Sequence, residues 1–174
     1  MSKRIFTPVF FFTIGVIMLS IVLRLLPHWP NFTPIAAMAL FAGAYLKRKE
    51  LAFAIPVSAM LISDLFLGFH QTMIAVYIGF ALIVGAGMLL RRHVHITTVV
   101  LASLGSSILF FLITNFAVWA SGMVGYPMTG AGLMQSYVAA IPFFRNALMG
   151  DLLYNAVFFG SFYFVSRRYP AFAA

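Results

Sequence analysis

Six apolar runs separated by short polar connections organise the chain. They cover residues 5–26, 32–46, 51–69, 72–90, 96–121 and 138–165. A helix that crosses a bilayer needs about 20 mostly apolar residues, and five of the runs approach or exceed that length. The second run has about 15 residues, so it is either a short spanning helix or a re-entrant segment. We favour the spanning helix, because the charge pattern requires a crossing there.

Basic residues gather between the apolar runs, at positions 3–4, 47–49, 91–92 and 167–168. Lys and Arg are enriched in cytoplasmic loops. With a cytoplasmic N-terminus and six crossings, all four clusters fall on the cytoplasmic side. The pattern therefore predicts that both termini are cytoplasmic. The first run is longer than a signal-peptide core and no A-x-A-like site follows it, so we expect it to stay as the first helix.

The composition supports a membrane location. Of 174 residues, 63% are hydrophobic and 8% are charged, and the mean hydropathy is +1.04, whereas soluble domains have about 25% charged residues. We therefore expect an all-α, multi-pass protein of the bacterial cytoplasmic (inner) membrane, with one six-helix domain over residues 1–174. The net charge of +8 lies in the loop clusters, which suit lipid head groups better than nucleic acid. Cysteine is absent, which excludes disulfides and thiolate sites.

The polar residues inside the runs concentrate towards the predicted outer side. Arg24 is near the outer end of the first run, and Asp64 is about one turn below the outer end of the third. Asn115 and Trp119 are one turn apart and share a helix face, while Arg145 is about two turns into the sixth run. Because the inner half is nearly apolar, we predict a pocket that opens outward and is closed below.

Arg145 and Asp151 lie on one predicted helix but cannot pair with each other. A separation of six residues places them about 120° apart around the helix and about 9 Å apart along it. Asp64 matches Arg145 in depth, so we expect those two to pair, with Asp151 forming the floor of the pocket. Charges inside a membrane are costly and mark functional sites by default, although such pairs can also simply fix the helix packing.

The outer connections are residues 27–34, 68–71 and 122–136. The third is long enough to fold over the pocket as a lid. His28 and His70 lie in the first two and could act as ligands, hydrogen-bond donors or proton acceptors, although each alone also suits an interfacial position. In the second run, Ala39-x-x-x-Gly43 permits a close helix contact, either within the chain or with a partner subunit.

Catalytic and metal-site motifs are missing from the sequence. It has no G-x-S-x-G, H-E-x-x-H or Walker A pattern, so we expect neither an enzyme nor a chain that hydrolyses ATP by itself. We also expect no cofactor and no metal site, because His93-x-His95 sits among basic residues suited to head-group contact.

Four stretches carry a resemblance to a known family. They are RLLPHWPNFTPIAAMALFAGAYL (24–46), SDLFLGFH (63–70), FFLITNFAVW (110–119) and AIPFFRNALMGDLLY (140–154). Together they resemble DUF6580, a family of small bacterial six-helix proteins proposed to act in transport. That family in turn resembles the substrate-binding S components of energy-coupling-factor (ECF) transporters, and most closely the solitary ones proposed to carry cobalamin.

The resemblance implies an outward-open vitamin pocket and delivery by toppling of the whole protein. The positions that match are His28, Asp64, Tyr77 and Arg145, with Asn31, Asn115 and Asp151 beside them. The first run offers only Gly15 and Ser20 in place of the A-x-x-x-A pattern by which S components engage an energising module. Since the chain lacks cysteine, any corrinoid would need a His ligand or none.

The sequence thus predicts a substrate-binding component for uptake of a small molecule, with a cobalamin-like vitamin as the best guess. Its partners would be that molecule, the lipid bilayer and an energising module. The alternatives are an ion- or proton-coupled carrier that uses Asp151, or a structural subunit of a membrane complex. The predicted substrate-binding residues are Arg24, His28, Asn31, Asp64, His70, Tyr77, Asn115, Trp119, Arg145 and Asp151.

Overall fold

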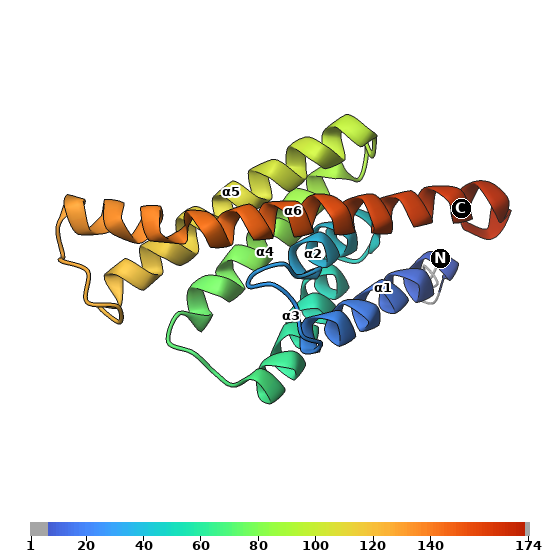
Figure 1. Ribbon diagram of the computed structural model, residues 1–174. Helices are drawn as coiled ribbons and strands as arrows, with labels where there is room; N and C mark the ends of the chain where they lie inside the picture. The colour runs from blue at the N-terminus through green and yellow to red at the C-terminus, as the bar shows by residue number, and fades with distance from the viewer. Residues whose placement is uncertain (1–6, 173–174) are drawn as a thin grey trace.

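Residues 7–172 are described by a computed structural model, in which every regular element is a helix (Figure 1). Five helices are long and apolar enough to cross a membrane, as expected of a multi-pass membrane protein. The sixth, α2, is shorter. The elements are α1 (Pro8–Leu25), α2 (Ile35–Tyr45), α3 (Lys49–Leu67), α4 (Met73–Leu90), α5 (Ile96–Ala120), α6 (Gly130–Arg168) and the 3-10 helix η1 (Pro170–Phe172).

The helix ends agree with the predicted runs except in the last helix. There the prediction of a long connection over 122–136 was wrong, because α6 already begins at Gly130 and has 39 residues. The Thr129 side chain accepts a hydrogen bond from Gly132 N, and such a cap satisfies one of the free N–H groups of a helix start. The residues proposed as a lid are therefore partly helical. The predicted first-run residues 5–6 and the basic residues Lys3 and Arg4 lie outside the described range.

The short helix α2 lies at the centre of the protein. It contacts each of the five other α-helices, and nine of its eleven residues are buried. At about 1.5 Å per residue it is only about 16 Å long, which is about half of a bilayer's hydrocarbon thickness. Protein, rather than lipid, therefore surrounds α2.

Helices α2 and α4 approach each other backbone to backbone. A Cβ atom on Gly43 would overlap the carbonyl oxygen of Val84, and one on Gly87 would overlap the carbonyl oxygen of Leu40. Small residues allow such close approach in membrane proteins. The small-residue pattern at Ala39-x-x-x-Gly43 thus serves a contact within the chain.

The C-terminal carbonyls of α2 are covered by a cation from the α4–α5 loop. Arg91 donates from Nε to the oxygen of Gly43 at 2.9 Å, and from its two terminal nitrogens to the oxygens of Leu46 and Lys47 at 2.5 and 3.3 Å. The last carbonyls of a helix have no partner within the helix, and a cation is favourable at that end. Arg91 therefore supports α2 in addition to any contact with lipid.

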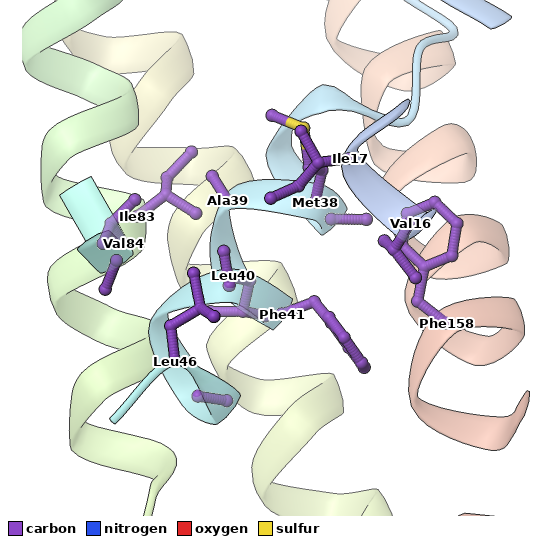
Figure 2. Close-up of a cluster of buried hydrophobic side chains, with 14 of the residues drawn as sticks. Val16, Ile17, Met38, Ala39, Leu40, Phe41, Leu46, Ile83, Val84 and Phe158 are labelled. Carbon is purple, nitrogen blue, oxygen red and sulfur yellow. The ribbon is translucent and has the colours of Figure 1, made fainter. Parts of the chain in front are cut away.

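Aromatic and aliphatic side chains close the bundle around the C-terminal half of α2. Figure 2 shows this buried cluster, to which α1, α2, α4 and α6 contribute. The ring of Phe41 is fully buried and meets the ring of Phe159 edge to face, with centroids 5.1 Å apart. The ring centroids of Tyr45 and Phe162 are 4.0 Å apart. Phe12 of α1 contacts Phe172 of η1, so both ends of the described chain meet at this side. Packed apolar side chains therefore form a plug around the C-terminal end of α2.

The α2–α4 contact yields a prediction with a control in the same helix. Gly87→Ala should lower stability by about 1–3 kcal/mol, the usual cost of overpacking, because its methyl group would push against the Leu40 carbonyl. Gly85→Ala has nothing within 4 Å of its Cβ and should be neutral or stabilising, since Ala favours helix over Gly. Thermal unfolding of the detergent-purified proteins measures both. Equal effects of the two substitutions would contradict the proposed contact.

Candidate functional site

A cavity of about 420 Å³ lies among the helices, and each of α1 to α6 contributes to its wall. This volume is within the range of small-molecule sites, about 300–1,000 Å³. Asn31 and His70 are exposed residues of the α1–α2 and α3–α4 loops and form part of the rim. Ser107 and Asp151, which are buried near the middle of α5 and α6, also line it. The cavity therefore runs from loop residues at one end to the interior of the bundle.

The α1–α2 loop is held against α6 at the rim. Asn146 donates its side-chain amide to the oxygen of Pro30 at 3.1 Å, and a Cβ on Gly150 would touch the backbone of Phe32 at 3.4 Å. Asn31 adopts a φ of 62°, a left-handed conformation that Asn tolerates better than most residues. These contacts place Asn31 on the cavity and give the rim a defined shape.

Arg24 lines the cavity, and its charge is matched by Asp64. Arg24 Nη2 lies 2.6 Å from Asp64 Oδ1, while Nη1 contacts the Ser63 hydroxyl and the oxygen of Met60 at 3.4 Å. Tyr77 donates its hydroxyl to Asp64 Oδ2 at 2.8 Å. Asp64 is almost fully buried, at 1% exposure. One carboxylate thus joins α1, α3 and α4 and holds Arg24 in place.

The expectation that Asp64 pairs with Arg145 was wrong. Asp64 pairs with Arg24, and Arg145 is exposed, does not line the cavity and has no hydrogen bond or ion pair to the described part of the chain. The match in depth favours Arg145, but depth does not determine which helix faces meet. The packing of α1 against α3 decides the partner. The prediction that Arg145 and Asp151 do not pair with each other is confirmed.

Asp151 is buried and lacks a cationic partner within residues 7–172. It is 6% exposed, and its one hydrogen-bond donor there is the Ser107 hydroxyl, 2.6 Å from Asp151 Oδ2. The same hydroxyl lies 2.9 Å from the oxygen of Ser103. Since a hydroxyl has one proton to donate, Ser107 can serve only one of these acceptors at a time.

Further buried polar groups lie beside Asp151. One turn along α6, Asn155 donates to the Ser103 hydroxyl at 3.0 Å. Asn155 Oδ1 and the Ser106 hydroxyl are buried without a hydrogen-bond partner. Unpaired buried polar atoms are uncommon and call for an explanation. This group of polar residues sits where α5 and α6 pack together, below the cavity.

Much of the cavity wall is aromatic. Phe80 comes from α4, and the others come from α5 and α6; Phe111 and Phe144 pack 4.7 Å apart across those two helices. Thr114 and Asn115 add polar atoms to the wall, although the Asn115 amide donates to the oxygen of Phe111 in its own helix. The site therefore combines an apolar body with a few polar groups, as small-molecule sites usually do.

Five of the ten predicted residues line the cavity. They are Arg24, Asn31, His70, Asn115 and Asp151. Asp64 and Tyr77 do not line the cavity; Asp64 pairs with Arg24, and Tyr77 donates a hydrogen bond to Asp64. His28 is exposed and contacts the oxygen of Leu26 through Nδ1 at 2.6 Å, while the Trp119 indole donates to the oxygen of Pro127 at 2.9 Å. These two, with Arg145, lie off the cavity wall.

Sequence reasoning missed Ser107, which carries the hydrogen bond to Asp151. The available signal was Ser103, Ser106 and Ser107 in an otherwise apolar segment, because a spacing of three and four residues places them on one helix face. It also missed the phenylalanines of the wall, because phenylalanine suits lipid contact and core filling as well as a binding site. The spacing of these phenylalanines along the sequence does not show whether they face lipid, the core or a pocket.

Comparison with known proteins identifies the family. The profile described as "Family of unknown function (DUF6580)" matches residues 4–172. The chain belongs to DUF6580. This confirms the family resemblance seen in the sequence, and the family description assigns no function. No curated protein and no solved structure matches this DUF6580 chain.

The Arg24–Asp64 pair of this DUF6580 protein yields a stability prediction. Asp64→Ala would leave the largely buried Arg24 without its ion-pair partner, which should cost up to about 3–5 kcal/mol. The double variant Arg24→Met, Asp64→Leu should recover much of that loss, because no isolated charge remains.

The control is Glu50→Gln, which breaks the exposed Arg48–Glu50 contact at 3.5 Å and should cost at most about 1 kcal/mol. Thermal unfolding in detergent gives the comparison. If the double variant were no more stable than Asp64→Ala, the paired-charge explanation would fail.

Proposed function

We propose that the chain is a substrate-binding membrane component for uptake of a small molecule. The observation that carries this proposal is the cavity of about 420 Å³, with its aromatic wall and its few convergent polar groups, inside a bundle of membrane-spanning helices. A purely structural subunit has no need of such a space. Close packing without voids is the norm for protein interiors.

The distribution of basic residues supports an outward-facing cavity. Residues 47–49 and 91–92 lie beside the C-terminal end of α2, and Arg167 and Arg168 end α6 near η1. The cavity rim belongs to the opposite loops, α1–α2 and α3–α4. Basic loops stay on the cytoplasmic side, so the rim faces outward. The proposed location is the bacterial cytoplasmic membrane.

The cavity volume narrows the size of the substrate. A space of about 420 Å³ suits a molecule of the size of a small vitamin, metabolite or drug. A whole corrinoid is considerably larger and could enter only in part. We therefore propose a vitamin-sized substrate. Binding of a whole cobalamin-like molecule would require the rim of the cavity to open further.

The energy source is proposed to be a partner module or an ion gradient. In α1, Gly15 is exposed but Ser20 is buried and donates to the oxygen of Val16. The two small residues thus do not form one outward surface for a partner. The uncompensated Asp151 on the cavity wall favours the second candidate, an ion- or proton-coupled carrier, because protonatable carboxylates inside membranes are typical of such carriers.

A substitution that fills the cavity tests the function. Ala147 lines the cavity, and Ala147→Phe should abolish retention of any bound small molecule. Ala156 is an exposed residue of the same helix, so Ala156→Phe should retain it. Mass spectrometry of small molecules extracted from the purified proteins measures this. If the wild type retains nothing that Ala147→Phe lacks, the pocket does not hold a substrate.

The two energy sources differ in their response to an uncoupler. Cells that express the protein should lose uptake of the retained molecule on addition of a protonophore when an ion gradient drives the carrier. Uptake by an ATP-driven module should continue while ATP is maintained. Measuring uptake together with cellular ATP separates the two cases.

A further inference from the structure

The ionisable side chains around the cavity differ in whether they have a partner of opposite charge. The whole chain has three acidic residues. Glu50 is exposed beside Arg48. Asp64 forms an ion pair with Arg24 and accepts a hydrogen bond from Tyr77. This leaves Asp151, which lines the cavity and has no ion pair with the described residues.

The other charged group on the cavity wall is already neutralised. The guanidinium of Arg24 is directed at α3, where it meets the Asp64 carboxylate at 2.6 Å and contacts Ser63 and Met60. A ligand anion would have to compete with this buried carboxylate. Arg145, which the sequence analysis named among the substrate-binding residues, is outside the wall.

The N-terminus of α2 modifies this charge but does not cancel it. Thr33, Ile35 and Ala36 lie on the cavity wall, and no side chain caps this helix end. A helix N-terminus corresponds to about half a positive charge, which is less than the full charge of a carboxylate. Among the ionisable groups on the cavity wall, the carboxyl group of Asp151 is therefore the one whose negative charge, when ionised, has no counterion among the described residues.

The wall suits an organic cation better than a bare metal ion. The space of about 420 Å³ greatly exceeds the roughly 30 Å³ of one water molecule, and much of its wall consists of phenylalanine rings. Aromatic faces attract ammonium groups within about 6 Å of the ring centre, and quaternary ammonium ligands are recognised in this way. Phe111 and Phe144 supply such rings on α5 and α6, the two helices that carry Ser107 and Asp151.

We propose that the cavity binds an organic cation, with the ammonium group at Asp151 and an apolar or aromatic body between the phenylalanine side chains. This proposal rests on the proposed function and specifies its substrate class. The cation supplies the countercharge that Asp151 lacks. Ser107 is then free to donate to Asp151 or to the Ser103 carbonyl as the ligand enters and leaves.

The test uses three probes with the same aromatic body and different charge. They are benzyltrimethylammonium, its neutral isostere neopentylbenzene and the anion phenylmethanesulfonate. Binding is measured by calorimetric titration of the full chain in phosphatidylcholine nanodiscs, at constant ionic strength, with empty nanodiscs as reference. The cation should bind the wild type at least about tenfold more tightly than the other two, since charge-assisted contacts are the stronger ones.

Asp151→Asn keeps the shape of the side chain and removes its charge. It should weaken cation binding by about tenfold or more, a loss of about 1.4 kcal/mol, and should leave binding of the neutral probe unchanged. Glu50→Gln is the matched control, because it also turns an acid into its amide but lies outside the cavity, and it should bind like the wild type. Thermal unfolding of both variants checks that they are folded.

Three outcomes of the calorimetric titrations would overturn the proposal. They are equal binding of the three probes, cation binding by Asp151→Asn as tight as by the wild type, and no binding of the cation at all. Stabilisation by Na⁺ or K⁺ equal to that by benzyltrimethylammonium would also overturn it, in favour of an inorganic ion.

These failures are separable from failure of the proposed function. If the wild type retains a small molecule that Ala147→Phe loses while the cation does not bind, the pocket stands and only its charge preference is wrong. If no molecule is retained and no probe binds, both proposals fall.

Discussion

The structure depends on one constraint, the need to enclose a helix that is too short for the membrane. Helix α2 has 11 residues, and lipid cannot satisfy the backbone groups at its ends. The protein meets this constraint by surrounding α2 with the other helices. Gly43 and Gly87 bring α4 against it, and Arg91 covers its last carbonyls. The arrangement of the longer helices follows from this enclosure.

The cavity is a consequence of the same short helix. Because α2 begins well inside the bundle, the space beyond its N-terminus is left to a loop and to side chains of the neighbouring helices. At its other end, Phe41, Tyr45 and Phe162 fill the interior. The bundle is thus closed at the end that carries the basic residues and hollow at the other. A binding component that receives its ligand from outside requires this asymmetry.

Much of the fold could be predicted from hydropathy, because a long apolar run has few alternatives to a membrane helix. The start of α6 could not, since residues 130–136 include two glycines, Gln135 and Ser136, and only the cap at Thr129 marks the helix. The depth of each charge was also predictable, because it depends on sequence position along a helix. Position along the helices identified Arg24, Asp64 and Asp151 as candidate site residues. It did not identify the residues with which they pair.

The sequence by itself determined the all-helical class, the placement of the polar residues in one half of the bundle and the apolar plug in the other. These follow from local hydrophobicity and the helical repeat. Only the tertiary structure decided that Asp64 pairs with Arg24, that Arg145 is exposed, and that Asp151 has Ser107 as its one hydrogen-bond donor within residues 7–172. Ion pairing depends on which helix faces meet in three dimensions, and that choice is made by the packing around α2 rather than by any single segment.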